Sequence, residues 1–153
     1  MPSSSGCLRE AVVKWHKPPV WPVAIPAFVG FVLAVIATAM AGLMQGLGVP
    51  FLRFGWLMML GAAIPFGAAR DPADESDARF GDQFAGVLMA LVLGYWPQLV
   101  IPPWVVFVFL AWILQSTYLW KRDYPPFRFG VWLGLGLMSG FWGGAILAGL
   151  VLL

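Results

Sequence analysis

The sequence predicts an all-α fold, a small bundle of about five transmembrane helices. Of its 153 residues, 61% are hydrophobic and only 10% are charged, whereas a soluble domain carries about a quarter charged residues. The mean hydropathy is +0.84, and the apolar residues are gathered in long segments between short charged stretches. Such a chain has too little polar surface to cover its apolar side chains in water. We therefore expect it to fold in a lipid bilayer.

The chain divides into a polar N-terminal segment, residues 1–20, and a single transmembrane domain, residues 21–153. The first apolar segment, 21–47, exceeds the roughly 20 residues that a spanning helix needs. The second, 51–68, follows a tight turn. Arg53 lies at its start, where the long side chain can reach the lipid headgroups.

The third predicted segment is 83–101 and contains Pro97, which predicts a kink or an early end of the helix. The uncharged pair Pro102-Pro103 then turns the chain into the fourth segment, 104–120. These two segments cross the membrane separately, or form one re-entrant pair that leaves four spans. The last segment, 130–153, ends the chain.

Two charged loops, at about 70–82 and 121–128, separate the segments. With a cytoplasmic N-terminus, eight basic residues lie inside and only Arg53 outside, as the positive-inside rule requires. The eight are Arg9, Lys14, Lys17, Arg70, Arg79, Lys121, Arg122 and Arg128. We expect a bacterial-type inner-membrane protein with its C-terminus outside. The basic residues expected at lipid headgroups are Arg53, Arg70, Lys121, Arg122 and Arg128.

Small residues recur every four positions in the last segment, at Gly136, Gly140, Gly144 and Ala148. They share one helix face and let another backbone approach closely. This face packs against the protein's own helices or against a partner protein.

The nine tryptophans divide into two groups. Most fall near predicted segment ends, as in an interfacial aromatic belt: Trp15, Trp21, Trp96, Trp104, Trp120 and Trp132. Trp56, Trp112 and Trp142 lie deeper, where they fill gaps left by glycines or contact a pigment or quinone.

The predicted segments carry no Asp, Glu, Lys or His well inside them, which argues against an ion-coupled transporter and against haem. Their most polar residues, Gln98 and Gln115-Ser116-Thr117, can satisfy one another across helices. No basic run is dense enough to indicate a nucleic-acid partner. The acidic loop residues and Asp82 offer Mg²⁺ ligands, with Lys121 for a phosphate, but an ordinary solvated loop has the same composition.

Residues 65–153 resemble the phosphatidylglycerophosphatase A family of small membrane lipid phosphatases. Asp82-Gln83-Phe84-Ala85-Gly86 stands where that family has Asp-Glu-x-x-Gly. The family then has an Arg, an Asp and a Lys-Pro pair, and this sequence has Gln115, Tyr118 and Lys121-Arg122 in those places. The family's Gly-x-Met-x-Asp-Asp corresponds to residues 136–141, which precede the Ala148-Gly149 pair.

The acidic residues of the family are replaced at Gln83, Tyr118, Gly140 and Phe141, while Asp82 and Lys121 remain. The resemblance therefore implies a relative that cannot assemble the family's Mg²⁺ site.

We expect a non-catalytic accessory or structural subunit in a larger inner-membrane complex, with the bilayer and other membrane subunits as partners and with no cofactor or metal. The alternatives are a Mg²⁺-dependent lipid-phosphate phosphatase that uses Asp82 and Lys121, and a pigment- or quinone-binding protein.

Overall fold

The computed structural model describes residues 20–46, 51–69, 80–117 and 126–152. These residues form helices and short connections, which confirms the all-α fold. The five helices in this part of the chain are α1 (Val20–Gly46), α2 (Phe51–Ala68), α3 (Phe80–Val100), α4 (Trp104–Thr117) and α5 (Pro126–Leu152).

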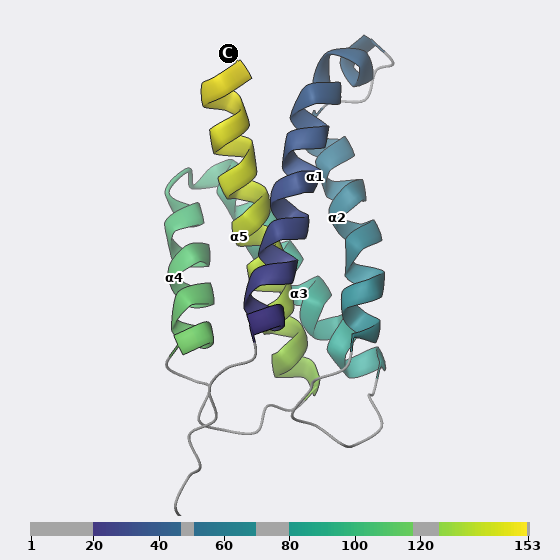
Figure 1. Cartoon of the computed structure of the whole chain (residues 1–153), viewed down its shortest axis with the longest axis vertical. Helices are drawn as coiled ribbons and strands as arrows, with labels where there is room; N and C mark the ends of the chain where they lie inside the picture. Colours follow the sequence, from purple (N-terminus) through teal and green to yellow (C-terminus); the bar gives the residue numbers. More distant parts are fainter. Residues whose placement is uncertain (1–19, 47–50, 70–79, 118–125, 153) are drawn as a thin grey trace, which may run out of the picture.

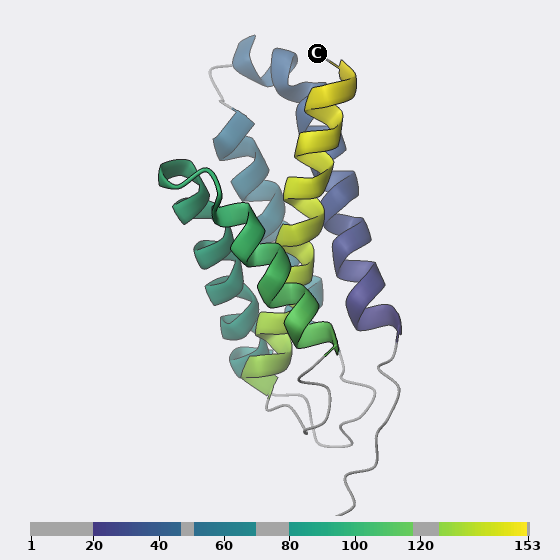
Figure 2. The same cartoon turned by 90° about the vertical axis from the view of Figure 1, so that its left-hand side faces the viewer.

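The five helices form one bundle in which consecutive helices run in opposite directions (Figure 1). Helix α5 is central and has its most extensive contacts with α1 and α3. Helix α2 packs on α3 and α1, and α4 lies on the outer side of α5, which it crosses at a slant in Figure 2. The start of α1, the end of α2, the start of α3, the end of α4 and the start of α5 share one end of the bundle.

Apolar side chains cover the outside of the bundle. Phe28 on α1 is 68% exposed, Leu57 on α2 61% and Leu110 on α4 50%. Three of the described helical stretches are long and apolar enough to cross a membrane: Pro22–Ala41, Phe80–Val100 and Pro126–Val151. Helix α4 has 14 residues, which is roughly 21 Å at 1.5 Å per residue. Its described length is therefore shorter than a hydrocarbon core of about 30 Å.

Helices α3 and α5 begin earlier than predicted, within the two charged stretches. Residues 80–82 form the first turn of α3 and residues 126–128 the first turn of α5. A proline tolerates the first helical position, where its missing N–H has no intrahelical acceptor. Pro126 therefore starts the helix that the sequence analysis began at residue 130.

Helix α3 passes through Pro97 and continues to Val100, so the predicted early end is wrong. Pro97 lacks the N–H that would bond to the carbonyl of Leu93, four residues earlier. The Trp104 indole Nε1–H donates to that carbonyl at 2.7 Å, and the Trp142 indole donates to the next carbonyl, of Gly94, at 2.9 Å. The Trp104 side chain thus supplies the donor that Pro97 lacks.

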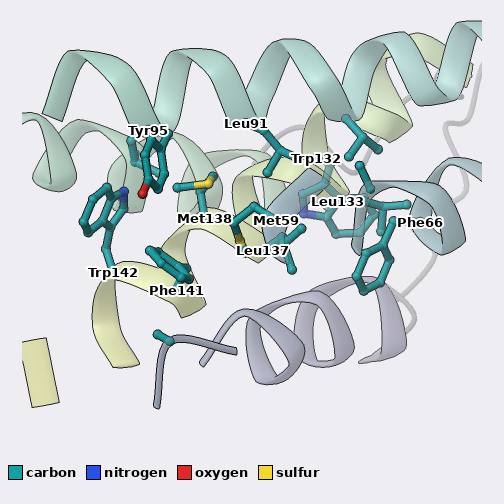
Figure 3. Close-up of a cluster of buried hydrophobic side chains, with 14 of the residues drawn as sticks. Met59, Phe66, Leu91, Tyr95, Trp132, Leu133, Leu137, Met138, Phe141 and Trp142 are labelled. Atoms are coloured by element: carbon teal, nitrogen blue, oxygen red, sulfur yellow. The ribbon is translucent and has the colours of Figure 1, made fainter. Parts of the chain in front are cut away.

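The core runs along α5 (Figure 3). Leu137 and Met138 lie near its middle with Met59 of α2, all with no exposed surface. Towards one end lie Tyr95 and Trp142, with ring centroids 5.4 Å apart. The core side chains therefore tie α2, α3 and α5 together.

Candidate functional site

The glycine face of α5 packs against α1 of the same chain. A Cβ atom on Gly140 would overlap the carbonyl oxygen of Ala27, and one on Gly144 would lie 2.7 Å from that of Phe31. Gly30 of α1 reciprocates, because a Cβ there would overlap the carbonyl oxygen of Leu137. Of the two predicted uses of this face, packing within the chain is the one the structure contains.

The ends of the predicted glycine face have other neighbours. A Cβ on Gly136 would lie 2.9 Å from the indole Nε1 of Trp112 on α4 and 3.3 Å from Cβ of Pro26 on α1. Trp112 thus fills space left by a glycine, as the sequence analysis expected of the deeper tryptophans. Ala148 is 6% exposed near the end of α5.

A second glycine contact, between α3 and α5, escaped the sequence analysis. A Cβ on Gly86 would overlap the carbonyl oxygen of Phe127, and one on Gly130 would overlap that of Gln83. The signal was present in the Asp82-Gln83-Phe84-Ala85-Gly86 motif, where Gly86 lets the two backbones meet. Gly86, Ala90 and Gly94 recur every four residues on α3, which is the same kind of pattern as on α5.

Gln83, where the resembled family has Glu, joins α3 to the end of α2. It is 2% exposed, and its Nε2 donates to the carbonyl of Phe66 at 2.8 Å and to that of Ala69. Carbonyls in the last turn of a helix have no intrahelical donor. The Phe66 carbonyl also accepts from Ala69 N at 3.4 Å. An amide can donate to both carbonyls, and a carboxylate could donate to neither.

The other polar residues bind separate partners rather than one another, contrary to the sequence prediction. Gln98 accepts from Val105 N at 2.6 Å and donates to the carbonyl of Pro102, so it holds the turn between α3 and α4. Gln115 Nε2 lies 3.4 Å from the carbonyl of Arg128. Thr117 donates to its own helix at Ile113. Each of these contacts fixes one end of α4 or closes its own turn.

Trp132 is not an interfacial residue as predicted. It has no exposed surface, and its Nε1 donates to Ser116 Oγ at 2.8 Å. The early start of α5 explains this difference, because it places Trp132 in the second turn, against α4. Trp96 is 50% exposed, as a belt residue should be.

Two buried polar atoms have no hydrogen-bond partner in the described part of the chain: the indole Nε1 of Trp112 and Oγ of Ser139. Ser139 is 1% exposed. Buried polar groups nearly always have a partner, so these two atoms, one on α4 and one on α5, are exceptions among the described residues.

The charged side chains of the described helices all lie at helix starts. Arg53, Asp82 and Arg128 are each the third residue of their helix. Asp82 is exposed and lies where the helix dipole favours a negative charge. Arg53 is at the opposite end of the bundle from Asp82 and Arg128. Because each of these charged residues is in the first turn of its helix, none of them lies in the middle of the bundle.

The remaining predicted site residues, Lys121, Arg70 and Arg122, lie outside the described residues, as do the carboxylates of the loop at 70–79. Within the described ranges no group of three or more His, Cys, Asp and Glu side chains is placed to hold a metal ion. A comparison of the chain with protein-family models, with curated protein sequences and with solved structures finds no match.

Proposed function

We propose that this protein is a non-catalytic accessory subunit of a larger inner-membrane complex, anchored by five transmembrane helices with the N-terminus in the cytoplasm. The observation that carries the proposal is the use of the buried polar side chains. Gln83 and Trp142 bond to backbone carbonyls of neighbouring helices, and Trp132 bonds to Ser116. These groups hold helices together and are not directed at a substrate.

The alternating helix directions support the five-span arrangement. The helix ends that lead into residues 1–19, 70–79 and 118–125 share one end of the bundle (Figure 1). In the sequence those three stretches carry seven of the nine basic residues: Arg9, Lys14, Lys17, Arg70, Arg79, Lys121 and Arg122. The positive-inside rule assigns that end to the cytoplasm.

A topology reporter tests this assignment. Fused after Leu153, it should report the non-cytoplasmic side, and inserted at Ser76 it should report the cytoplasm. The same side for both positions would contradict five spans.

The proposed partner must bind an outer face of the bundle, because α1 covers the glycine face of α5. Three well-exposed apolar residues sample three helices: Phe28 on α1, Leu57 on α2 and Leu110 on α4. Each is replaced in turn by a photo-crosslinking amino acid in cells. If a subunit partner covers one face, the crosslinker on that face should give one discrete protein adduct. If lipid covers all three faces, none of the three positions should give a protein adduct.

Purification from the native membrane in a mild detergent is the matching biochemical test. We expect a second membrane protein at fixed stoichiometry, identified by mass spectrometry, and the same protein in the crosslinked adduct. A monodisperse protein that purifies alone and forms no protein adduct would overturn the accessory role.

The proposal also requires that purified protein does not release phosphate from phosphatidylglycerophosphate in the presence of Mg²⁺. Turnover that disappears in Asp82→Ala would favour the phosphatase alternative instead. If Asp82→Asn also loses turnover while its thermal unfolding temperature is unchanged, the carboxylate has a chemical role and not a structural one.

A further inference from the structure

Helix α4 meets α5 along a contact that we call the α4–α5 seam, lined by Phe109, Trp112, Gly136, Ser139 and Gly143. Two buried polar atoms have no partner among the described residues, Trp112 Nε1 and Ser139 Oγ. Ser139 is three residues after Gly136 and four before Gly143, whose Cβ positions face Trp112 and Phe109 of α4, so it shares their helix face. Trp112 comes from the middle of α4, and Ser139 from the middle of α5.

The two atoms lie close together along α5. Trp112 Nε1 is 2.9 Å from the position of a Cβ atom on Gly136. Gly136 and Ser139 are three residues apart, and Cβ positions at that spacing on a helix are about 5–6 Å apart. Two hydrogen-bond donors are therefore gathered within about one helical turn.

The seam is tightly packed at Gly136, where a Cβ would lie 2.9 Å from Trp112 Nε1, and it is looser at Gly143, about one turn beyond Ser139. A Cβ on Gly143 would meet a single atom, Phe109 Cζ at 3.7 Å, which is an ordinary contact distance. The equivalent atom on Gly140, facing α1, would overlap the backbone. The polar contacts of α4 are at its two ends, through Trp104 and Gln98 at one and Ser116 at the other. Among the described residues, no hydrogen bond joins the middle of α4 to α5.

We propose that the α4–α5 seam binds the carbonyl oxygen of a neutral, lipophilic carbonyl compound of the quinone type. The indole N–H and the serine hydroxyl are both donors, so one acceptor oxygen satisfies both. Water is scarce at this depth in a bilayer, and the unpaired donors are costly there. The three charged side chains of the described helices are at helix starts, so the site offers no ionic partner, which selects a neutral ligand.

Lipid ester carbonyls have the same chemistry but lie near the headgroups, whereas Trp112 and Ser139 lie near the middle of their helices. The site therefore fits a carbonyl on a molecule dissolved within the bilayer. The accessory role and this site are independent, because the proposed partner contacts the outside of the bundle.

The test uses full-length protein in nanodiscs of saturated diether lipid, which carries no ester carbonyl. A decyl-substituted benzoquinone is titrated while thermal unfolding is followed, with decylbenzene as the probe that lacks the oxygen. We expect saturable stabilisation by the quinone and none by decylbenzene. Trp112→Phe and Ser139→Ala should each weaken binding about fivefold to tenfold, the effect of one neutral hydrogen bond. The matched control, Trp96→Phe at an exposed position, should bind as the parent does.

Three results would overturn the proposal. The first is no saturable stabilisation, or equal stabilisation by decylbenzene. The second is stabilisation by the quinone that survives in the Trp112→Phe and Ser139→Ala double variant. The third is a lower unfolding temperature of ligand-free Ser139→Ala, because that loss would show that the hydroxyl already has a partner, such as a bound water. Stabilisation of the parent by ester-linked lipid in place of the quinone would assign the site to a lipid carbonyl.

Discussion

Two sides of helix α5 are packed in different ways. Towards α1 and α3 the backbones touch through glycines, with Gly140 against Ala27 and Gly86 against Phe127. Towards α4 the contact is made by side chains, with Trp132 bonded to Ser116 and Phe109 in ordinary contact near Gly143. The first kind of contact tolerates no added atom, whereas the second has room for one at Gly143, although not at Gly136 beside Trp112.

The difference follows from what holds helices together in lipid. Apolar side chains gain little there from leaving the solvent, because lipid tails solvate them equally well. Close fit and hydrogen bonds remain, and each side of α5 relies mainly on one of them. We therefore expect the α1 side to be rigid and sensitive to volume, and the α4 side to be sensitive to loss of hydrogen bonds.

The largest expected effect is that of Gly140→Ala. Its methyl group would overlap the Ala27 carbonyl oxygen, which belongs to backbone and cannot turn away. Separating α1 from α5 should lower the free energy of unfolding by about 3 kcal/mol or more, the upper range for overpacking. Reversible unfolding in mixed detergent micelles measures this value.

Gly149→Ala is the matched control for Gly140→Ala, because it lies on the same helix and a Cβ there meets nothing within 4 Å. It should leave the free energy of unfolding unchanged or slightly raised. Equal losses in both variants would mean that the helix itself, and not the contact with α1, responds to the added methyl group.

The helices themselves could largely be predicted from the sequence, because long apolar runs have few alternatives in a bilayer. The second segment was predicted at 51–68 and forms α2 over Phe51–Ala68. The starts of α3 and α5 were predicted three and four residues too late. In both places residues that can occupy a first helical turn, Phe80 and Pro126, follow a charged stretch. Of the two effects predicted for Pro97, the early end of the helix was wrong, because the donor that replaces its N–H belongs to Trp104, seven residues later and on the next helix.

The partner of the glycine face could not be predicted. Spacing alone shows that Gly136, Gly140 and Gly144 share a face, and it does not show which backbone approaches them. The reciprocal Gly30 is one of three glycines in α1, with Gly42 and Gly46, and its sequence neighbours do not show that it packs against α5. Similarly, the sequence gives no reason to separate Trp112, which lacks a partner among the described residues, from Trp142, which bonds to Gly94.

The Trp104 indole should contribute about 1 kcal/mol, the usual net value of a hydrogen bond, and only while Pro97 is present. Trp104→Phe removes the donor to Leu93. In a Pro97→Ala background the new backbone N–H can bond to Leu93, so Trp104→Phe should then cost nearly nothing. A double-mutant cycle of unfolding free energies measures the coupling. Equal costs of Trp104→Phe in both backgrounds would contradict this role of the indole.

The hydrogen bond between Trp132 and Ser116 is expected to have a smaller effect, with a coupling energy of about 0.6 kcal/mol, the average for such pairs between membrane helices. A cycle of Trp132→Phe and Ser116→Ala isolates it from the loss of packing. In either single variant, backbone amide hydrogen exchange should become faster in α4 and stay unchanged in α1, since α4 is held to α5 by side-chain contacts. A rise spread equally over α1 and α4 would argue against independent sides of α5.

The smallest effect, and the sharpest comparison, is that of Gly143→Ala. Gly143 is three residues from Gly140 on the same helix, but it faces α4, where the new methyl group would meet Phe109 Cζ at 3.7 Å. A helix gains up to about 1 kcal/mol when alanine replaces glycine, from lower chain entropy in the unfolded state, and nothing here opposes that gain. We expect the free energy of unfolding to rise by a few tenths of a kcal/mol to about 1 kcal/mol. A loss as large as that of Gly140→Ala would show that α4 packs on α5 as tightly as α1 does, and the distinction between the two sides of α5 would be lost.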